Sequence, residues 1–211
     1  MIRVLVADDH PVVRGGIKQA LSDSIAGVVI GEACTVQELF QQIEKQRWDV
    51  VILDITMPGG GGLEALGRLK QERPSLPVLM LSVYPEDQFA VRAIRAGASG
   101  YLTKKSLPEE LVRAVKTVLG GVKYLSPAVA DLMATHIQQK VNDVPPHTRL
   151  SDREFQVFRA LVRGKTVGEI ADELTLSIKT ISTYRARVLE KLDVKTNTDL
   201  ARYAFQHHLE E

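Results

Sequence analysis

The sequence predicts an α/β domain of the flavodoxin-like, doubly wound class with a five-stranded parallel sheet, followed by an all-α helix-turn-helix domain. Across residues 1–120, short β-type apolar runs alternate five times with helical patterns, and this alternation is typical of a parallel sheet with crossover helices. From residue 148 onward there is no strand pattern. A chain of 211 residues allows two modest domains. We therefore expect domains at 1–120 and 148–211, joined by a linker with one helix at 121–147.

The first domain is expected to contain five strands and five helices. The strands are predicted at 2–7, 28–33, 50–54, 78–82 and 99–102, and the helices at 11–21, 35–46, 62–72, 86–96 and 108–119. Thr35 with Glu38 indicates a capping box at the start of the second helix. Pro11, Pro85 and Pro108 lie where a first helical turn tolerates proline.

The second half of the chain is predicted to be helical. A helix from Ser126 to about residue 139 precedes a polar, proline-containing linker at 141–147. Four further helices are expected at 152–163, 167–174, 178–192 and 197–208. Their predicted start signals are Ser151 with Glu154, Ser177, and Thr196 with Asp199.

Composition says more about the cellular compartment of the protein than about its binding partner. The net charge of +1 indicates no partner by itself, so a nucleic-acid surface must be local. The single Cys34 excludes an internal disulfide and fits a reducing cytosol. No stretch approaches the roughly 20 continuous apolar residues of a membrane span, and no signal peptide is apparent. We expect a cytoplasmic protein with no membrane partner.

Chemistry-bearing side chains follow the predicted strands. Asp8-Asp9 and Asp54 end apolar runs, and Lys104 follows a third run. The carboxyl ends of parallel strands lie along one sheet edge, so these groups should converge. Clustered carboxylates repel one another, and a divalent cation such as Mg²⁺ relieves the repulsion. Aspartate can accept a phosphoryl group covalently, with Lys104 and the hydroxyl of Ser82 contacting its oxygens.

These landmarks resemble the receiver domain of bacterial two-component response regulators. The matching motifs are Asp8-Asp9, Asp54-x-x-Met57-Pro58-x-x-x-Gly62, Ser82 and Tyr101-x-x-Lys104. The resemblance implies that Asp54 is the phosphorylation site and that Asp9 and Asp54 bind Mg²⁺ directly. It also implies that Asp8 acts through water and that the Thr56 carbonyl is a ligand. Ser82 and Tyr101 would form the switch pair, and Lys104 would contact the phosphoryl group.

Three features near these motifs needed separate interpretation. Val83 stands where the family favours a smaller residue, so it could crowd the pocket, and the Gly59–Gly62 run suggests a mobile loop. The glycine run lacks the Gly-x-x-x-x-Gly-Lys-[Ser/Thr] and Gly-x-Gly-x-x-Gly patterns of nucleotide-binding loops. His10 was interpreted as an exposed loop residue, with a metal ligand as the alternative.

The helix at 178–192 carries the second function. Its predicted buried stripe comprises Ile181, Tyr184, Val188, Leu189 and Leu192. The opposite face is small in the middle and basic at its flanks, which suits a DNA major groove. With the short helix before it and the turn Thr175-Leu176-Ser177, it forms a predicted helix-turn-helix. A small helical bundle with a solvated face is the alternative.

The segment 148–211 also resembles the LuxR-type DNA-binding domain. The matching residues are Leu150-Ser151-x-Arg153-Glu154, Gly164-Lys165, Glu169-Ile170-Ala171, Leu174, Ser177-x-Lys179-Thr180-Ile181, Arg187 and Lys191-Leu192-x-Val194, with Tyr184 where many members have histidine. The expected DNA-binding residues are Thr166, Lys179, Thr180, Ser182, Thr183, Arg185, Ala186 and Arg187. With both domains, the chain resembles a NarL/FixJ-type response regulator.

The resemblance implies a phosphorylation-controlled transcription regulator. A sensor histidine kinase would donate the phosphoryl group, and a homodimer formed on phosphorylation would bind double-stranded DNA. Leu200, Ala201, Tyr203 and Ala204 could form the dimer surface or pack within their own bundle. One rival is a Mg²⁺-dependent aspartyl-phosphate phosphatase, but Thr56 stands where such enzymes need a second aspartate. The other rival is a phosphorylation-independent DNA-binding regulator.

Overall fold

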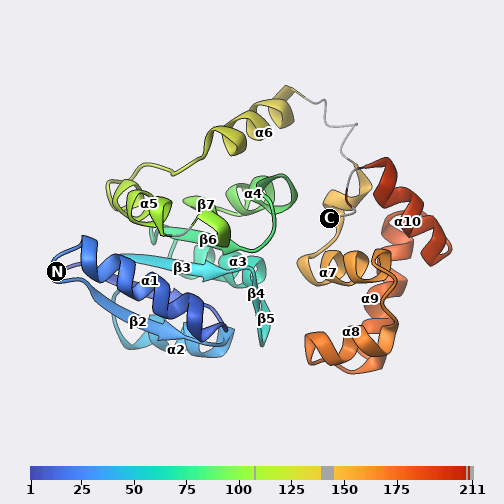
Figure 1. Cartoon of the computed structure of the whole chain (residues 1–211), viewed down its shortest axis with the longest axis horizontal. Coiled ribbons are helices and arrows are strands. Elements are labelled where there is room, and N and C mark those ends of the chain that lie inside the picture. Colours follow the sequence, from blue (N-terminus) through green and yellow to red (C-terminus); the bar gives the residue numbers. More distant parts are fainter. Residues whose placement is uncertain (107, 139–144, 208, 210–211) are drawn as a thin grey trace. The chain divides into compact units, whose positions relative to one another are not determined.

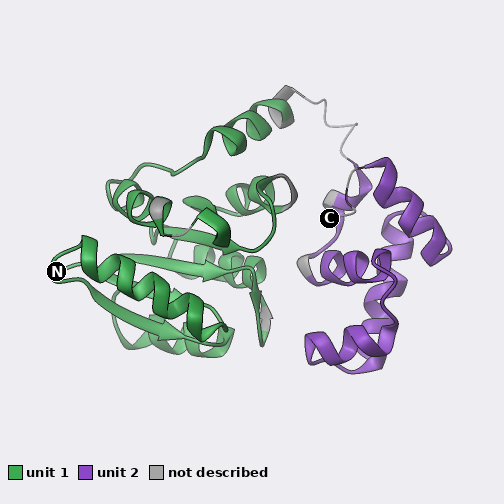
Figure 2. Ribbon diagram, viewed as in Figure 1, with its two compact units in different colours: residues 1–138 green, residues 139–211 purple. Residues whose placement is uncertain are grey.

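The computed structural model describes residues 1–106, 108–138, 145–207 and 209. The chain divides into two compact units, residues 1–138 and 139–211 (Figure 2). Residues 121–138 thus belong to the first unit, whereas the sequence analysis assigned them to a linker. The predicted linker residues 141–144 and the predicted helical residue 208 lie outside the described residues.

The first unit is built on a five-stranded parallel sheet (Figure 1). The strands are β1 (Arg3–Ala7), β2 (Val29–Ala33), β3 (Val50–Asp54), β6 (Val78–Ser82) and β7 (Gly100–Thr103). Their order is β2-β1-β3-β6-β7, so the direction of winding reverses between β1 and β3. The predicted doubly wound α/β class is confirmed. The reversal creates a crevice at the carboxyl ends of β1 and β3, where ligands bind in such sheets.

Burial on both faces explains the continuous apolar runs of the central strands. Every residue of β3 and β6 is buried, as are Val4 to Ala7 of β1. The surrounding helices are α1 (Pro11–Ser24), α2 (Val36–Lys45), α3 (Gly62–Glu72), α4 (Glu86–Arg95) and α5 (Glu109–Leu119). Side chains of α1 and α5, including Ile17 and Leu111, share one core cluster with β1, β3 and β6. Two-sided burial of this kind is characteristic of parallel sheets.

The helix starts follow the predicted signals with small differences. Pro11 occupies the first turn of α1, whereas Pro85 and Pro108 stand one residue earlier, at the N-caps of α4 and α5. The Thr35 side chain accepts from the Glu38 N–H, but the Glu38 carboxylate accepts from the Cys34 N–H rather than closing on Thr35. The capping box predicted there is therefore only half formed.

The glycine run forms a hairpin that the sequence analysis did not predict. Strands β4 (Thr56–Met57) and β5 (Gly60–Gly61) pair antiparallel, directly after Asp54. Gly59 has a φ of +87°, and Pro-Gly is the pair that a type II turn favours at its centre. The run is thus a paired turn leading into α3, and its suggested mobility stays a prediction.

The chain continues to pack on the first unit after α5. The Tyr124 N–H donates to the Ser99 carbonyl at 2.8 Å, and Tyr124 forms a parallel bridge with Gly100. Helix α6 (Pro127–Gln138) then packs against α4. The Ser126 hydroxyl donates to the Glu86 carboxylate at 2.8 Å. These contacts explain why the first compact unit extends beyond residue 120.

The second unit is all-α within its described residues. It contains the 3₁₀ turn η3 (Pro146–Arg149) and helices α7 (Asp152–Val162), α8 (Val167–Leu174), α9 (Ile178–Lys191) and α10 (Asn197–Gln206). Capping boxes begin α7, α8 and α10, and the Ser177 side chain caps α9. Helix α9 packs against both α7 and α8. The predicted all-α domain is confirmed.

Candidate functional site

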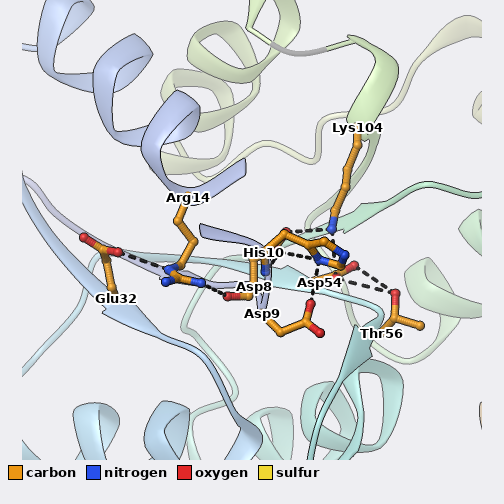
Figure 3. A network of polar contacts seen from close by, with 8 residues as sticks. All are labelled: Asp8, Asp9, His10, Arg14, Glu32, Asp54, Thr56 and Lys104. Atoms are coloured by element: carbon orange, nitrogen blue, oxygen red, sulfur yellow. Dashed lines mark hydrogen bonds and ion pairs between the residues drawn. The ribbon is translucent and has the colours of Figure 1, made fainter. Parts of the chain in front are cut away.

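The sheet edge brings together three groups that are far apart in the sequence. Asp8 follows β1, Asp54 ends β3 and Lys104 follows β7 (Figure 3). Lys104 Nζ lies 2.9 Å from Asp54 Oδ2 and 2.8 Å from Asp8 Oδ2, although only the contact with Asp54 has hydrogen-bond geometry. One ammonium group thus bridges two carboxylates at the predicted position.

Burial and charge set the protonation of this cluster. The side chains of Asp8 and Asp54 are fully buried. Burial raises the pKa of Asp54 to about 6, with Lys104 opposing the rise and the Asp8 charge adding to it. Burial alone would lower the pKa of Lys104, but the Asp54 charge and its contacts with both carboxylates outweigh burial and raise it. The negative charge of the two carboxylates therefore exceeds the single positive charge of Lys104, and this excess favours binding of a cation.

Asp9 and His10 complete the open side of the cluster. His10 Nδ1 lies 2.7 Å from Asp9 Oδ1 and 3.2 Å from Asp8 Oδ1. The His10 side chain is 60% exposed, yet its ring points toward the carboxylates (Figure 3). Single ligand atoms of Asp8, Asp9, His10 and Asp54 all lie within 4.8 Å of one another. The sequence analysis treated His10 mainly as a loop residue, whereas the structure shows it exposed and beside the acidic pair.

Arg14 is a supporting residue that the sequence analysis missed. Its Nη1 donates to the Asp8 carbonyl oxygen at 2.7 Å, and its Nε donates to Glu32 at 3.1 Å (Figure 3). Lys18 also contacts Glu32, and these hydrogen bonds lower the pKa of Glu32. Arg14 thereby ties the backbone of the acidic pair to α1 and β2. The only sequence signal was a basic residue one helical turn after Pro11.

The hairpin after Asp54 positions its carboxylate. The Thr56 hydroxyl lies 3.5 Å from both carboxylate oxygens of Asp54. The Gly62 N–H donates to the Ile55 carbonyl at 2.8 Å, and a Cβ on Gly62 would overlap the Asp54 carbonyl oxygen. Only glycine therefore fits where α3 begins. The expected role of the Thr56 carbonyl as a metal ligand stays a prediction.

Ser82 and Tyr101 are joined through the residue Tyr84. The Tyr84 N–H donates to Ser82 Oγ at 3.0 Å, and the Tyr101 hydroxyl donates to the Tyr84 carbonyl at 3.0 Å. Ser82 and Tyr101 are buried, whereas Val83 is 53% exposed. Val83 is thus partly open to solvent, and its expected effect on access to the phosphorylation pocket stays a prediction.

The donor set fits a hard divalent cation. Three carboxylates from two strand ends supply oxygen ligands, and Mg²⁺ binds to one or two carboxylates together with water and phosphate oxygens. Lys104 occupies one side of the cluster, and the side facing Asp9 and His10 holds no ammonium group. Nothing in the geometry conflicts with the predicted Mg²⁺ ligands Asp9 and Asp54.

In the second unit, α9 presents the predicted exposed face. Ile181, Val188 and Leu192 are buried, with Tyr184 and Leu189 half-buried. On the other face the exposed residues are Lys179, Ser182, Thr183, Ala186, Arg187 and Glu190. The face is thus basic, with small residues at its centre.

Four of the expected DNA-binding residues, Thr166, Thr180, Thr183 and Arg185, have side-chain hydrogen bonds within the unit. Thr166 is the N-cap of α8, where its hydroxyl accepts from the Glu169 N–H and contacts the Glu169 carboxylate. The Thr180 hydroxyl lies 2.8 Å from Ser177 Oγ. Arg185 is half-buried, and its Nε donates to Asn197 Oδ1 at 2.8 Å. The Arg185 contact joins α9 to the start of α10, whereas the contacts of Thr166 and Thr180 are local to the starts of α8 and α9.

The apolar face of helix α10 packs mostly within its own bundle. Leu200, Tyr203 and Ala204 are buried against the second unit, so for these three residues the alternative of packing within their own bundle is confirmed. Ala201 is exposed, and Phe205 is 70% exposed. The apolar side chains left outside on α10 are therefore different from those expected.

Comparison with known proteins identifies both units. Residues 4–116 match the response regulator receiver domain, and residues 148–204 match the bacterial regulatory proteins of the luxR family. The chain belongs to the NarL/FixJ family of two-component response regulators. Its function is that of a two-component transcription regulator.

The relatives and solved structures cover both units. The chain is 41% identical to the response regulator GacA of Pseudomonas viridiflava over 208 residues, which is 98% of this chain and 97% of the relative. It is 35% identical to the response regulator UvrY of Escherichia coli strain K12, covering 99% and 96% of the two chains. It also resembles RcsB of Salmonella enterica serovar Typhimurium bound to the promoter rprA with a phosphomimetic, at 28% identity and a TM-score of 0.64, covering 96% of this chain and 98% of that one.

No helix in the described part of the chain is both long and apolar enough to traverse a bilayer.

Proposed function

We propose that Asp54 is the phosphoacceptor of this response regulator and that a sensor histidine kinase supplies the phosphoryl group. The observation that carries the proposal is the position of the Asp54 carboxylate. It is fully buried at the end of β3, is contacted by Lys104, and lies beside a second buried carboxylate. A buried carboxylate with a neighbouring ammonium is suited to attack phosphorus and to have the incoming charge offset.

The transfer conserves atoms and charge. An Asp54 oxygen forms a bond with phosphorus, while the bond between phosphorus and the donor's imidazole nitrogen breaks and that nitrogen takes up a proton. Lys104 holds the phosphoryl oxygens as they arrive. A Mg²⁺ ion held by Asp9 and Asp54, with Asp8 acting through water, would neutralise charge on the phosphoryl oxygens when bound. The Thr56 carbonyl would be a further ligand.

The structure suggests how occupancy of Asp54 reaches other surfaces. A phosphoryl oxygen that accepts from the Ser82 hydroxyl would draw Ser82 toward Asp54 and away from the Tyr84 N–H, which now donates to Ser82 Oγ. Release of Tyr84 also withdraws the carbonyl that accepts from Tyr101. Tyr101 is buried beside α4, whose N-terminal Glu86 accepts from Ser126 at the start of α6. Phosphorylation would therefore change the α4 and α6 surfaces on which dimerisation can depend.

We infer that the second unit binds double-stranded DNA through α9 as a homodimer. Lys179 and Arg187 are exposed at the flanks of α9, so they reach phosphates, whereas Ser182 and Thr183 reach base edges and Ala186 permits close approach. Arg185 and Thr180 support the helix through their contacts with Asn197 and Ser177, and either can also reach the backbone. Thr166 brings the N-terminus of α8 toward a phosphate. RcsB was solved as dimers on DNA, which supports this arrangement.

The experiment that tests the proposal is phosphorylation by acetyl phosphate with Mg²⁺, followed by intact-mass analysis. We expect one phosphoryl adduct on the unmodified chain and none on Asp54→Ala. Asp23→Ala is the matched control, because Asp23 is an exposed aspartate that contacts only Gln19 among the hydrogen bonds described. Equal phosphate incorporation by the Asp54 variant would refute the assignment. A phosphatase assay with an aryl phosphate excludes the enzyme alternative if there is no turnover.

A further inference from the structure

We propose that His10 is a nitrogen ligand of the cation site and gives this receiver a larger preference for Mn²⁺, Co²⁺ and Ni²⁺ over Mg²⁺ than an all-oxygen site would have. The inference rests on the proposed function only because the site is the one beside Asp54. Nothing in the motifs of the receiver domain assigns a role to this imidazole.

The position of the His10 ring carries the argument. Its Nδ1 lies 2.7 Å from Asp9 Oδ1 and 3.2 Å from Asp8 Oδ1. Two ligands on adjacent corners of an octahedron with bonds of about 2.1 Å are about 3 Å apart. The separation from Asp9 Oδ1, the expected direct ligand, is close to that value, and Asp8, which would act through water, lies slightly farther from the nitrogen. The nitrogen therefore lies where a neighbouring ligand of the same ion belongs.

The backbone holds the ring in this position. The His10 N–H donates to Asp8 Oδ1 at 2.8 Å, and the Arg14 N–H donates to the His10 carbonyl at 3.2 Å. His10 is the N-cap of α1, but its side chain makes no capping hydrogen bond. The imidazole therefore does not cap the helix, and the fixed backbone directs it over the acidic pair.

The surrounding charges leave this side of the cluster for the ion. Lys104 contacts Asp8 Oδ2 and Asp54 Oδ2, whereas His10 faces Oδ1 of Asp8 and Oδ1 of Asp9 (Figure 3). Asp9 Oδ1 is buried and has no hydrogen-bond partner among the described residues, so an ion bound opposite Lys104 would supply the partner it lacks. The ring is 60% exposed, so it can turn slightly to bring its lone pair onto the ion.

The chemistry of the nitrogen donor decides which ions bind more tightly. Mg²⁺ is a hard cation that prefers oxygen and keeps several waters. Imidazole suits later divalent transition metals, and affinity for mixed nitrogen and oxygen sites rises from Mn²⁺ through Co²⁺ to Ni²⁺. Loss of His10 should therefore reduce binding of these ions while leaving Mg²⁺ nearly unchanged.

Pulsed electron paramagnetic resonance of Mn²⁺ bound to the untagged full chain tests the contact directly. We expect electron spin echo modulation from a directly bound imidazole ¹⁴N, lost in His10→Ala. His207→Ala is the matched control and should keep the modulation, because His207 lies on the other unit. If the unmodified chain binds Mn²⁺ without ¹⁴N coupling, His10 is not a ligand and the inference is overturned.

Calorimetric titration of the same proteins with NiCl₂, MnCl₂ and MgCl₂ gives the selectivity. We expect His10→Ala to weaken Ni²⁺ and Mn²⁺ binding by about tenfold or more, with Mg²⁺ affinity changed less than about twofold. An equal loss for all three ions would mean that His10 acts only by placing Asp9, which also overturns the inference. If Asp54 is phosphorylated but bound Mn²⁺ shows no ¹⁴N coupling, only this inference is refuted. If the Asp54→Ala variant still accepts phosphate, only the proposed function is refuted.

Discussion

Ser82 and Tyr101 are connected through the two backbone polar groups of one residue. The Tyr84 N–H donates to Ser82 Oγ, and the Tyr84 carbonyl accepts from the Tyr101 hydroxyl, both at 3.0 Å. The rings of Tyr84 and Phe89 also pack together, with centroids 5.0 Å apart. A single residue, Tyr84, thus links the hydrogen bonding of Ser82 to that of Tyr101.

This relationship predicts how Ser82→Ala behaves. Without the hydroxyl, the Tyr84 N–H loses its acceptor, and the arriving phosphoryl group loses a donor. We expect faster amide hydrogen exchange at Tyr84 and slower phosphorylation by acetyl phosphate, with the fold intact. Exchange measured by mass spectrometry or NMR checks the first effect. Val122→Ala is the control, since Val122 is exposed and far from Ser82 in the chain; comparable effects in that variant would argue against the Ser82–Tyr84 contact as the cause.

Two glycines of α3 give a matched pair. A Cβ on Gly62 would overlap the Asp54 carbonyl oxygen, whereas a Cβ on Gly67 meets nothing within 4 Å. Gly62→Ala should therefore destabilise the first unit by roughly 2 kcal/mol or more through backbone displacement and impair phosphorylation. Gly67→Ala should stabilise it by up to about 1 kcal/mol, because alanine is the better helix former.

Urea unfolding followed by Trp48 fluorescence measures both variants. The chain has one tryptophan, and Trp48 is buried in the first unit. Equal stability of the two alanine variants would contradict the close packing of α3 on the Asp54 backbone.

The buried Asp54 carboxylate predicts a pH dependence of stability without metal. Its pKa is raised from 3.8 to about 6, chiefly by burial. Protons therefore bind more strongly to the folded state, and the associated stability is present below about pH 4 and lost as pH rises through 6. Asp54→Asn cannot ionise, so at pH 8 it should be more stable than the unmodified chain by on the order of 1–3 kcal/mol.

Trp48-detected unfolding in EDTA at pH 5 and pH 8 tests this prediction. The stability difference between Asp54→Asn and the unmodified chain should grow from pH 5 to pH 8, and added Mg²⁺ should shrink it by stabilising the ionised form. A difference that stays constant with pH would mean that Asp54 ionises as an exposed aspartate does.

The second unit contains an ion pair whose loss should be measurable. Lys191 Nζ lies 2.6 Å from Glu154, whose side chain is 3% exposed, and it also donates to the Arg149 carbonyl. Burial alone would raise the pKa of Glu154, but hydrogen bonds from Lys191 and Ser151 outweigh burial and lower it. Lys191 is 38% exposed, so water weakens this ion pair relative to a fully buried one. We therefore expect Lys191→Ala to lower the free energy of local unfolding by about 1–2 kcal/mol.

Hydrogen exchange of the α7 and α9 amides reports this loss. Lys165→Ala is the control, because Lys165 and Glu173 form a pair in which both partners are exposed, and such pairs contribute about 0–1 kcal/mol. Similar protection losses in the two variants would show that Lys191 adds no more than a surface contact.

Two exposed residues of α9 should affect DNA binding differently. Lys179→Ala should weaken binding to all sequences and flatten the salt slope by about one unit, because a phosphate contact is lost. Thr183→Ala should relax preference at one base position by roughly 1–3 kcal/mol. The Thr183 hydroxyl donates to the Lys179 carbonyl, so both lone pairs of its oxygen stay available to a base donor.

Fluorescence anisotropy across a salt series, on a selected site and on a scrambled site, separates the two effects. An unchanged salt slope for Lys179→Ala, or equal weakening of both DNAs by Thr183→Ala, would place a different face of α9 in the groove.

The sequence predicted the sheet and the acidic edge because both depend on local patterns. Apolar runs marked the strands, and the connectivity rules for parallel sheets bring Asp8, Asp54 and Lys104 to one edge. The hairpin after Asp54 was missed although Pro58-Gly59 is a turn signal, because a two-residue ladder leaves almost no pattern. The roles of Arg14 and Tyr84 depend on distances between separate elements, and no spacing in one sequence encodes such distances.

The two alternatives for α10 could not be separated for a similar reason. Leu200, Tyr203 and Ala204 recur at helical spacing, and that pattern shows that one face is apolar without showing what covers it. The structure covers it with the second unit itself, leaving Phe205 outside. Conversely, the caps at Ser151, Ser177 and Thr196 were predictable, because each is satisfied within three residues.

The pairing of Tyr124 with β7 has a consequence for how the protein can be divided. β7 is an edge strand of the sheet, and unpaired edge strands invite association with other chains. Tyr124 occupies part of that edge, with its N–H on the Ser99 carbonyl. A fragment cut at residue 120 would bare this edge and offer it to a second molecule, whereas a fragment cut at residue 138 keeps its own cover and can remain a monomer.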